Sequence, residues 1–172
     1  PHLEEDGDTF DENAYKKASF SARILGLPAL ADDSGLIVEV LGGAPGIHSA
    51  RYAGENATDE QRYLKLLDDM EGKSNRKAAF ECVISVAVPT GPALTYQARC
   101  EGLIATEPAG SNGFGYDPVF FYTPLNKTFA QITGDEKNRI SHRGKALAEF
   151  KSEFDKVLIW IRQHMSVQEK RD

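Results

Sequence analysis

The sequence is poor in sulfur and in tryptophan. Its 172 residues include two cysteines, two methionines and one tryptophan. Cys82 and Cys100 lie in separate strand-like segments, without metal-ligand spacing and without a neighbouring histidine. This pattern argues against a zinc site. It is typical of reduced core cysteines in a cytosolic protein.

Long apolar runs are also missing. The longest uninterrupted runs are only a few residues, which excludes a membrane-spanning helix. The N-terminus lacks the charged-then-apolar layout of a signal peptide. We therefore expect a cytoplasmic protein without a membrane partner. The chain opens at Pro1 without an initiator methionine, so we expect its natural start to lie upstream.

Positive charge is in deficit. The chain has 20 Lys and Arg residues and 26 Asp and Glu residues, which gives a formal charge of -6. This sign excludes a protein that binds nucleic acid polymers through their phosphates. A small anionic ligand needs only a local cluster of cations. With 41% hydrophobic and 27% charged residues, the composition is that of a globular chain, and we expect one domain over 1–172.

Capping sequences predict the helices. Thr9 with Glu12 predicts a helix over about 10–25, and Thr58 with Gln61 predicts one to about Met70. A short helix follows Thr133, and Ser141 can cap a last helix that runs to about 165. That helix carries an apolar stripe at spacings of three and four, which predicts core packing: Ala146, Leu147, Phe150, Phe154, Val157, Leu158 and Ile161.

Runs of alternating and β-branched residues predict the strands. Segments 28–31 and 36–41 read as two strands that meet at an acidic turn, 32–35. Segments 78–88 and 94–104 read as a hairpin, and 119–122 as a further strand. This mixture predicts an α/β or α+β fold with a mixed sheet.

The segment Asp32–Gly35 places two carboxylates and a hydroxyl at a predicted strand end. Strand ends are where α/β proteins present functional groups. The same residue types are ordinary turn formers, so the segment alone is equally consistent with a plain turn.

A second acidic cluster, Glu4–Asp8, precedes the first helix. Acids at a helix N-terminus usually stabilise the helix dipole. If one of them met Asp33 across a cleft, the pair could hold a magnesium ion that also binds substrate phosphates.

Two further segments could bind a nucleotide. In Gly113–Asp117, glycines flank Phe114 and allow close backbone approach, so an exposed ring could stack on a base; alternatively, the aromatic residues anchor the loop to the core. Lys137 and the run Ser141–Arg143 collect cations and donors at a helix start. The alternative is a solvated basic helix face.

Six motifs in order resemble the inosine triphosphatase family of non-canonical purine NTP pyrophosphatases, in its dITP/XTP pyrophosphatase branch. They span most of the chain: Thr9–Ala14, Ala31–Leu36, Gly43–Gly46, Ser49–Gly54, Phe114–Pro118 and Asn138–Gly144.

The resemblance implies a fold and a reaction. The fold would be α/β, an elongated mixed β-sheet with flanking helices and two lobes around a central nucleotide cleft, acting as a homodimer. The reaction would be Mg²⁺-dependent hydrolysis of the purine nucleoside triphosphates ITP, dITP and XTP to the monophosphate and pyrophosphate. The reaction would remove non-canonical purine nucleotides from the nucleotide pool.

The resemblance also assigns roles by position. Asp33 would be the general base and a magnesium ligand, and Glu5 the second metal-associated carboxylate. The remaining assigned residues would contact the substrate: Ser34, Phe114, Gly115, Tyr116, Asp117, Lys137, His142 and Arg143.

One departure from the family pattern is the absence of an N-terminal strand and phosphate-binding loop before Pro1. We expect a truncated sequence. The alternative is a catalytically impaired fragment that still binds purine nucleotides. A related pyrophosphatase acting on modified pyrimidines or on other nucleotides is a third possibility, disfavoured by the run Ser141–Arg143.

Overall fold

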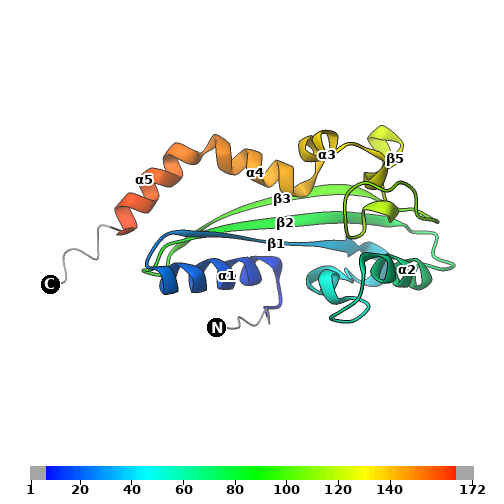
Figure 1. The fold of residues 1–172 in the computed structure, drawn as a ribbon, viewed down its shortest axis with the longest axis horizontal. Helices are drawn as coiled ribbons and strands as arrows, with labels where there is room; N and C mark the ends of the chain where they lie inside the picture. The colour runs from blue at the N-terminus through cyan, green and yellow to red at the C-terminus, as the bar shows by residue number, and fades with distance from the viewer. Residues whose placement is uncertain (1–6, 166–172) are drawn as a thin grey trace. The chain divides into compact units, whose positions relative to one another are not determined.

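The computed structural model describes residues 7–165. Its helices and strands are α1 (Phe10–Leu25), β1 (Ala29–Val38), α2 (Asp59–Asp69), β2 (Lys77–Ala87), β3 (Ala93–Ile104), β4 (Phe120–Tyr122), β5 (Lys127–Thr128), α3 (Gly134–Ile140), α4 (His142–Ser152) and α5 (Phe154–Met165). Short 3₁₀ turns occupy Glu39–Leu41, Gly46–Arg51, Asp117–Val119, Thr123–Leu125 and Phe129–Gln131 (Figure 1).

The five strands form one sheet in the order β1-β2-β3-β4-β5. Leu103 of β3 lies opposite Phe121 of β4, and Phe121 lies opposite Thr128 of β5, both in antiparallel register. The predicted α/β class is confirmed. The described sheet is antiparallel, however, where the sequence predicts a mixed one. Short connections such as that between β2 and β3 return the chain directly, and direct return produces antiparallel pairs.

The capping sequences act as predicted. Thr9 accepts a hydrogen bond of 3.1 Å from the backbone N–H of Glu12, and Gly26 ends α1 in the left-handed conformation. Full capping boxes open α2 at Thr58 and α3 at Thr133. Because each cap satisfies backbone donors that the first helical turn leaves unpaired, these helix starts are determined locally.

The predicted acidic turn is wrong. β1 runs without interruption from Ala29 to Val38, so Asp33 lies inside a strand rather than at its end. Asp33 and Gly35 are buried, while Ser34 is half-buried. Pairing within the sheet has outweighed the turn preference of these residues, as tertiary context often does for strands.

The predicted last helix is divided. A turn at Glu153 separates α4 from α5, and the Glu153 N–H is shared between the carbonyls of Glu149 and Phe150, each at 3.2 Å. The apolar stripe is therefore only partly buried. Ala146 and Val157 are in the core, whereas Leu147 and Phe154 are 44% and 45% exposed.

The chain divides into two compact units. Unit 1 comprises the described parts of 1–34 and 146–172 together with 82–98, and unit 2 comprises residues 35–81 and 99–145. Each unit has its own hydrophobic core. Within residues 7–165, we find no helix long and apolar enough to cross a membrane.

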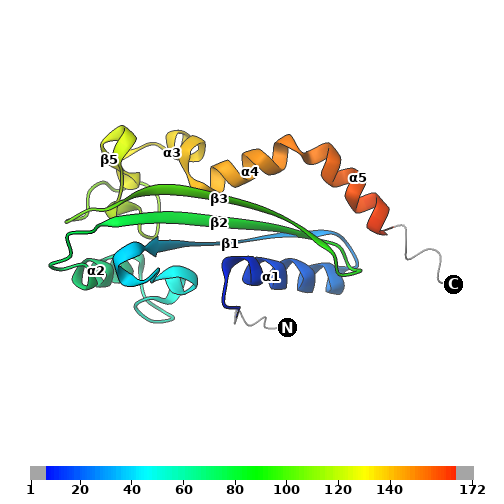
Figure 2. The ribbon, with the colours of Figure 1, turned by 180° about the vertical axis from the view of Figure 1, so that it is seen from behind.

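Unit 1 is layered, with α1 on one face of its strands and α5 on the other (Figure 2). Alternation along β2 explains this arrangement. Cys82, Ile84 and Val86 join the core beneath α4 and α5, whereas Ala87 packs with Ala18 and Ala22 of α1. Successive side chains of a strand point to opposite faces, so one strand serves both layers.

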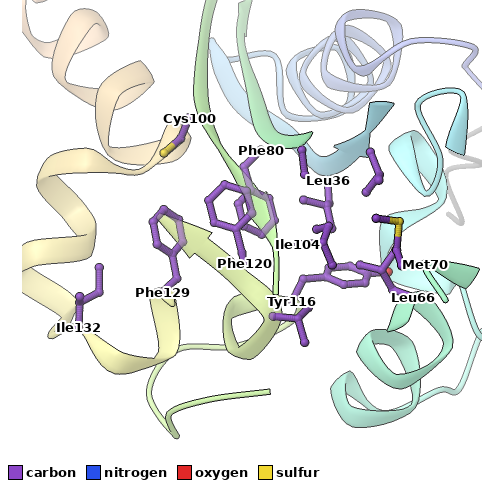
Figure 3. Close-up of a cluster of buried hydrophobic side chains, with 13 residues drawn as sticks. Leu36, Leu66, Met70, Phe80, Cys100, Ile104, Tyr116, Phe120, Phe129 and Ile132 are labelled. Atoms are coloured by element: carbon purple, nitrogen blue, oxygen red, sulfur yellow. The ribbon is translucent and has the colours of Figure 1, made fainter. Parts of the chain in front are cut away.

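The core of unit 2 is aromatic at its centre (Figure 3). The Phe80 ring lies 4.5 Å from that of Phe120 and 5.9 Å from that of Phe129, measured between centroids. Ring pairs at these separations add stabilisation beyond their buried area. The cluster draws on strands, α2 and the loops alike: Leu36, Val38, Leu66, Met70, Ala78, Phe80, Cys100, Ile104, Tyr116, Val119, Phe120, Phe129 and Ile132.

Candidate functional site

The loop 113–117, here called the Phe114 loop, presents an aromatic ring backed by a cation. Phe114 is 62% exposed, although large apolar side chains are usually buried. The ammonium nitrogen of Lys137, on α3, lies 4.2 Å from the centre of the ring. This is within the range of a cation–π interaction, which fixes one face of the ring and leaves the rest open.

A buried ion pair holds the lysine in place. The Lys137 ammonium contacts the carboxylate of Asp117, and the two side chains are 13% and 3% exposed. The same carboxylate accepts a hydrogen bond of 2.9 Å from the backbone N–H of Phe114. Burial raises the pKa of Asp117, and the Lys137 ammonium and the Phe114 N–H oppose that rise. The pair therefore ties the loop to α3 at one carboxylate.

Two glycines make the loop possible. A Cβ on Gly113 would overlap the carboxylate of Asp117, so this position has room only for hydrogen. Gly115 has a φ of 62°, in the left-handed region that side chains disfavour. The sequence predicts that these glycines allow close backbone approach. At Gly113 a side chain would collide with Asp117, and at Gly115 the backbone conformation favours glycine.

Tyr116 points in the opposite direction to Phe114, into the core. It is 4% exposed, and its hydroxyl donates a hydrogen bond of 2.7 Å to the Ser49 carbonyl. Burial raises the pKa of its phenol well above the usual value. Ser49 in turn accepts from the N–H of Leu36 at 2.9 Å. Tyr116 is therefore an anchor of the loop.

A second carboxylate holds the loop from α2. Asp59 accepts a hydrogen bond of 2.7 Å from the backbone N–H of Gly115. Its other oxygen pairs with the guanidinium of Arg62 at 2.5 Å. Arg62 also donates to the Ala57 carbonyl at 2.6 Å.

His142 lies at the start of α4, next to the aromatic core. Its ring stacks on Phe80 at 4.7 Å between centroids and 15° between planes, and the residue is 8% exposed. The Ser141 hydroxyl accepts from the N–H of Gly144 at 3.1 Å, as the sequence predicts for a cap. Arg143, the next residue after His142, is exposed.

In unit 1, Asp33 is held by a lysine from α1. The Lys17 ammonium lies 2.8 Å from a carboxylate oxygen of Asp33, and the side chains are 24% and 11% exposed. Ser34 donates a hydrogen bond of 3.3 Å to Asp32. Because successive strand residues face opposite sides, Asp32 and Asp33 do not share a face of β1.

The predicted site residues fall into two groups. Unit 2 brings together Phe114, Gly115, Asp117 and Lys137, with Tyr116 as their anchor in the core. His142 and Arg143 begin the helix that follows Lys137, and the Ser141 N–H donates to the Lys137 carbonyl at 2.8 Å.

Asp33 and Ser34 belong to unit 1. The placement of Asp33 across a crevice from the His142–Arg143 pair stays a prediction. Glu5 lies outside the described residues.

Comparison with known proteins identifies the family. The sequence profile of the Ham1 family matches residues 1–153. The chain belongs to the Ham1 family.

Two relatives of this Ham1 chain carry the same functional name. A dITP/XTP pyrophosphatase from Syntrophobacter fumaroxidans is 63% identical over 161 residues, covering 94% of this chain and 69% of that protein. A dITP/XTP pyrophosphatase from Desulfotalea psychrophila is 58% identical over 166 residues, covering 96% and 74%.

Solved structures share the fold. A HAM1 protein from Coxiella burnetii matches with a TM-score of 0.88 and 48% identity, covering 91% of this chain and 81% of that one. The Ham1 protein of Staphylococcus aureus matches with a TM-score of 0.87 and 43% identity over the same shares. The family inferred from the six sequence motifs is confirmed.

The carboxylates of this Ham1 chain suit a hard cation bound jointly with substrate. Within residues 7–165, no three His, Cys, Asp or Glu side chains gather as a ready-made metal cage. Magnesium does not require one, because it commonly uses one or two carboxylates together with waters and substrate phosphates. Asp33 offers such oxygen donors, so the residues present fit this ion.

Three contacts of the candidate residues were not predicted from the sequence: that of Lys17 with Asp33 in unit 1, and those of Asp59 and Arg62 in unit 2. Lys17 had a signal, because it falls four residues after Asn13 and three after Ala14, and therefore next to the buried face of α1. A charged residue beside such a face needs a partner. Asp59 gave no signal, since an acid in a first helical turn is already explained by the helix dipole.

Proposed function

We propose that this protein hydrolyses non-canonical purine nucleoside triphosphates, namely ITP, dITP and XTP, to the monophosphate and pyrophosphate. One observation supports this above the others. The exposed Phe114 ring rests on Lys137, whose charge is held by the buried Asp117. A ring fixed on one face and open on the other suits stacking against a nucleobase. The names of the relatives agree with this chemistry.

The purine base would bind at the Phe114 loop of unit 2, and the phosphates would meet Ser34 and Asp33 of unit 1. A nucleotide cleft between two lobes stays part of this proposal. Asp33 would act as the general base, accepting a proton from the water that attacks the α-phosphorus. Its hydrogen bond with Lys17 at 2.8 Å holds the carboxylate in one orientation before substrate arrives. Positioning and electrostatics account for most of the catalysis in phosphoryl transfer.

Magnesium would be held by Asp33 and by Glu5, which lies outside the described residues. When bound, the ion neutralises charge on the phosphates and on the departing pyrophosphate. Lys17 would then limit how Asp33 can turn, because its ammonium holds one carboxylate oxygen at 2.8 Å.

Discrimination between bases would come from His142 and Arg143. Hypoxanthine and xanthine carry a keto oxygen where adenine has an amine. Donors from these residues would hydrogen-bond to the keto oxygen, whereas they would face the N–H donors of the adenine amine. A site built to hydrogen-bond rejects a mismatched group by roughly 10⁴-fold. Stacking of His142 on Phe80 keeps its ring in one plane, which supports this role. Guanine shares the keto oxygen, and its rejection requires an obstacle at the 2-amino group.

We further propose that the active form is a homodimer located in the cytoplasm. Its substrates are free nucleotides, so neither a nucleic acid polymer nor a membrane is expected as a partner. Size-exclusion chromatography with light scattering tests the dimer directly. A monomer that is active at all concentrations would contradict it.

The decisive experiment supplies magnesium and ITP and identifies the products. We expect pyrophosphate and IMP, with XTP and dITP turned over at similar rates and with GTP, ATP and dUTP turned over slowly. Orthophosphate as the first product would exclude cleavage at the α-phosphorus. Preference for dUTP would favour a pyrimidine-directed relative, and nucleotide binding without turnover would favour the impaired fragment.

A further inference from the structure

We infer that Asp59 is a positioning residue for base binding, acting through the backbone of the Phe114 loop. The inference rests on the proposed function, because it takes the Phe114 ring as the surface that receives the base. Asp59 itself would touch neither substrate nor metal. Its role would be to fix the direction in which the ring points.

The loop is clamped at two consecutive amides by two different carboxylates. Asp117 accepts from the N–H of Phe114 at 2.9 Å, and Asp59 accepts from the N–H of Gly115 at 2.7 Å. The two acids come from opposite directions in sequence, one within the loop and one from the first turn of α2. Together they fix the two peptide planes that flank the Cα of Phe114.

The ring has little else to fix it. Phe114 is 62% exposed, and Gly115 has no side chain with which to brace the loop. A cation–π contact with Lys137 sets the distance to one face. Such a contact is weakly directional, so the backbone clamps set the point and the direction from which the side chain leaves the loop.

Arg62 makes the clamp rigid. It pairs with the Asp59 oxygen that does not bind Gly115, at 2.5 Å, and donates to the Ala57 carbonyl at 2.6 Å. The Nε of Arg62 is buried and has no hydrogen-bond partner among the described residues. A guanidinium tolerates one missing hydrogen bond only where its other hydrogen bonds are strong. The bond from Arg62 to the Asp59 carboxylate is charge-assisted and is therefore strong. Asp59 is thus held in place rather than free to rotate.

A purely structural explanation also exists. An acid in the first turn of a helix stabilises the helix dipole, and Asp59 shares that turn with Glu60. The two explanations differ in what they predict. Glu60 can stabilise the helix dipole as well as Asp59 can, whereas the N–H of Gly115 donates its hydrogen bond to Asp59.

The test compares Asp59→Ala, Asp59→Asn and the matched control Glu60→Ala in steady-state hydrolysis of ITP. We expect Asp59→Ala to raise KM about tenfold, because one charge-assisted hydrogen bond is lost. The value of kcat should change less than about twofold. Asp59→Asn keeps an oxygen for the Gly115 N–H and should raise KM by an intermediate factor. Glu60→Ala should leave both constants unchanged.

A double-mutant cycle with Phe114→Ala identifies the route of the effect. If Asp59 acts through the ring, Asp59→Ala should change KM less than about twofold once Phe114 is absent. Full additivity of the two substitutions would overturn the inference. An equal rise of KM in Glu60→Ala, or a fall in kcat alone, would overturn it as well.

Binding of IMP, measured by titration calorimetry, separates this inference from the proposed reaction. If the wild-type chain releases no pyrophosphate, the proposed function fails, while a Kd for IMP weakened about tenfold by Asp59→Ala alone would still support the clamp. Equal affinities in the wild type and Asp59→Ala would contradict the clamp even if hydrolysis is confirmed.

Discussion

Lys17, in the middle of α1, pairs with Asp33, in the middle of β1, at 2.8 Å. Neither residue stands at the end of its element, and both are mostly buried. Removing one partner from such a pair leaves a poorly solvated charge. The proposed catalytic carboxylate is therefore part of the packing between α1 and the sheet, which fixes its position more firmly than a turn would.

Replacing Asp33 by Asn should abolish hydrolysis in a chain that still folds, although the loss of the pair with Lys17 should lower the free energy of unfolding. The amide cannot accept the proton of the attacking water, and general-base catalysis contributes about 10²- to 10⁴-fold. The rate of pyrophosphate release and the circular dichroism spectrum measure the two effects. Asp68→Asn, the same change at an exposed position of α2, is the control. A retained rate in Asp33→Asn would remove this residue as the base.

Replacing Phe114 by Ala should raise KM for ITP by about 5- to 150-fold, because stacking on an aromatic side chain contributes about 1–3 kcal/mol per base. Phe114→Trp should retain binding, since it keeps a flat ring over Lys137. Little effect on thermal stability is expected, as the ring is exposed. If KM is the same in both variants, stacking is not the role of this side chain.

Replacing Asp117 by Asn, or Lys137 by Met, should each lower the free energy of unfolding by about 3 kcal/mol, since each leaves one buried charge without its partner. The double variant should lose less than the sum, because no uncompensated charge remains. Urea unfolding of the four proteins measures this. Additive losses would mean that the two groups do not interact.

Replacing Arg143 by Ala should mainly reduce the preference for keto purines. Arg143 is exposed, so stability should change by less than about 0.5 kcal/mol. The ratio of kcat/KM for ITP to that for ATP is the readout, with Lys145→Ala as the control from the same helix. An unchanged ratio would count against the assigned role of Arg143.

Stability should fall at alkaline pH through the half-buried Tyr52 and the buried Tyr96 and Tyr116. Burial, reinforced by the hydrogen bond to Asp69, raises the pKa of Tyr52 to about 12, and burial also raises the pKa values of Tyr96 and Tyr116. The folded state then keeps protons that the unfolded state releases above its ordinary tyrosine pKa near 10. The stabilising effect is complete below about pH 10 and is lost as the pH rises through the raised values.

Urea unfolding at about pH 9 and about pH 11, with the ultraviolet absorbance of tyrosinate followed in parallel, measures this dependence. Tyr52→Phe should make the fall less steep. If all tyrosines ionise near pH 10 in the folded protein, the assignment to buried phenols is wrong.

The sequence by itself determined the features that depend on neighbours in the chain. Helix starts at Thr9, Thr58 and Thr133 follow from side chains that bond to amides three residues away, and the order of the motifs identified the family. The Phe114 loop and Lys137 were predicted as site residues for the same reason, because glycine spacing and local charge are visible in the chain.

Only the tertiary structure decided what depends on partners far away in sequence. The segment Asp32–Gly35 has the composition of a turn, yet packing in the sheet keeps it extended. Lys17 meets Asp33, and Asp59 meets Gly115 across 56 positions of the chain. No local pattern encodes such contacts, because a carboxylate is chemically the same in a cap, a turn or a clamp. Its role is decided by how deeply the carboxylate is buried and by which other helix, strand or loop packs against it.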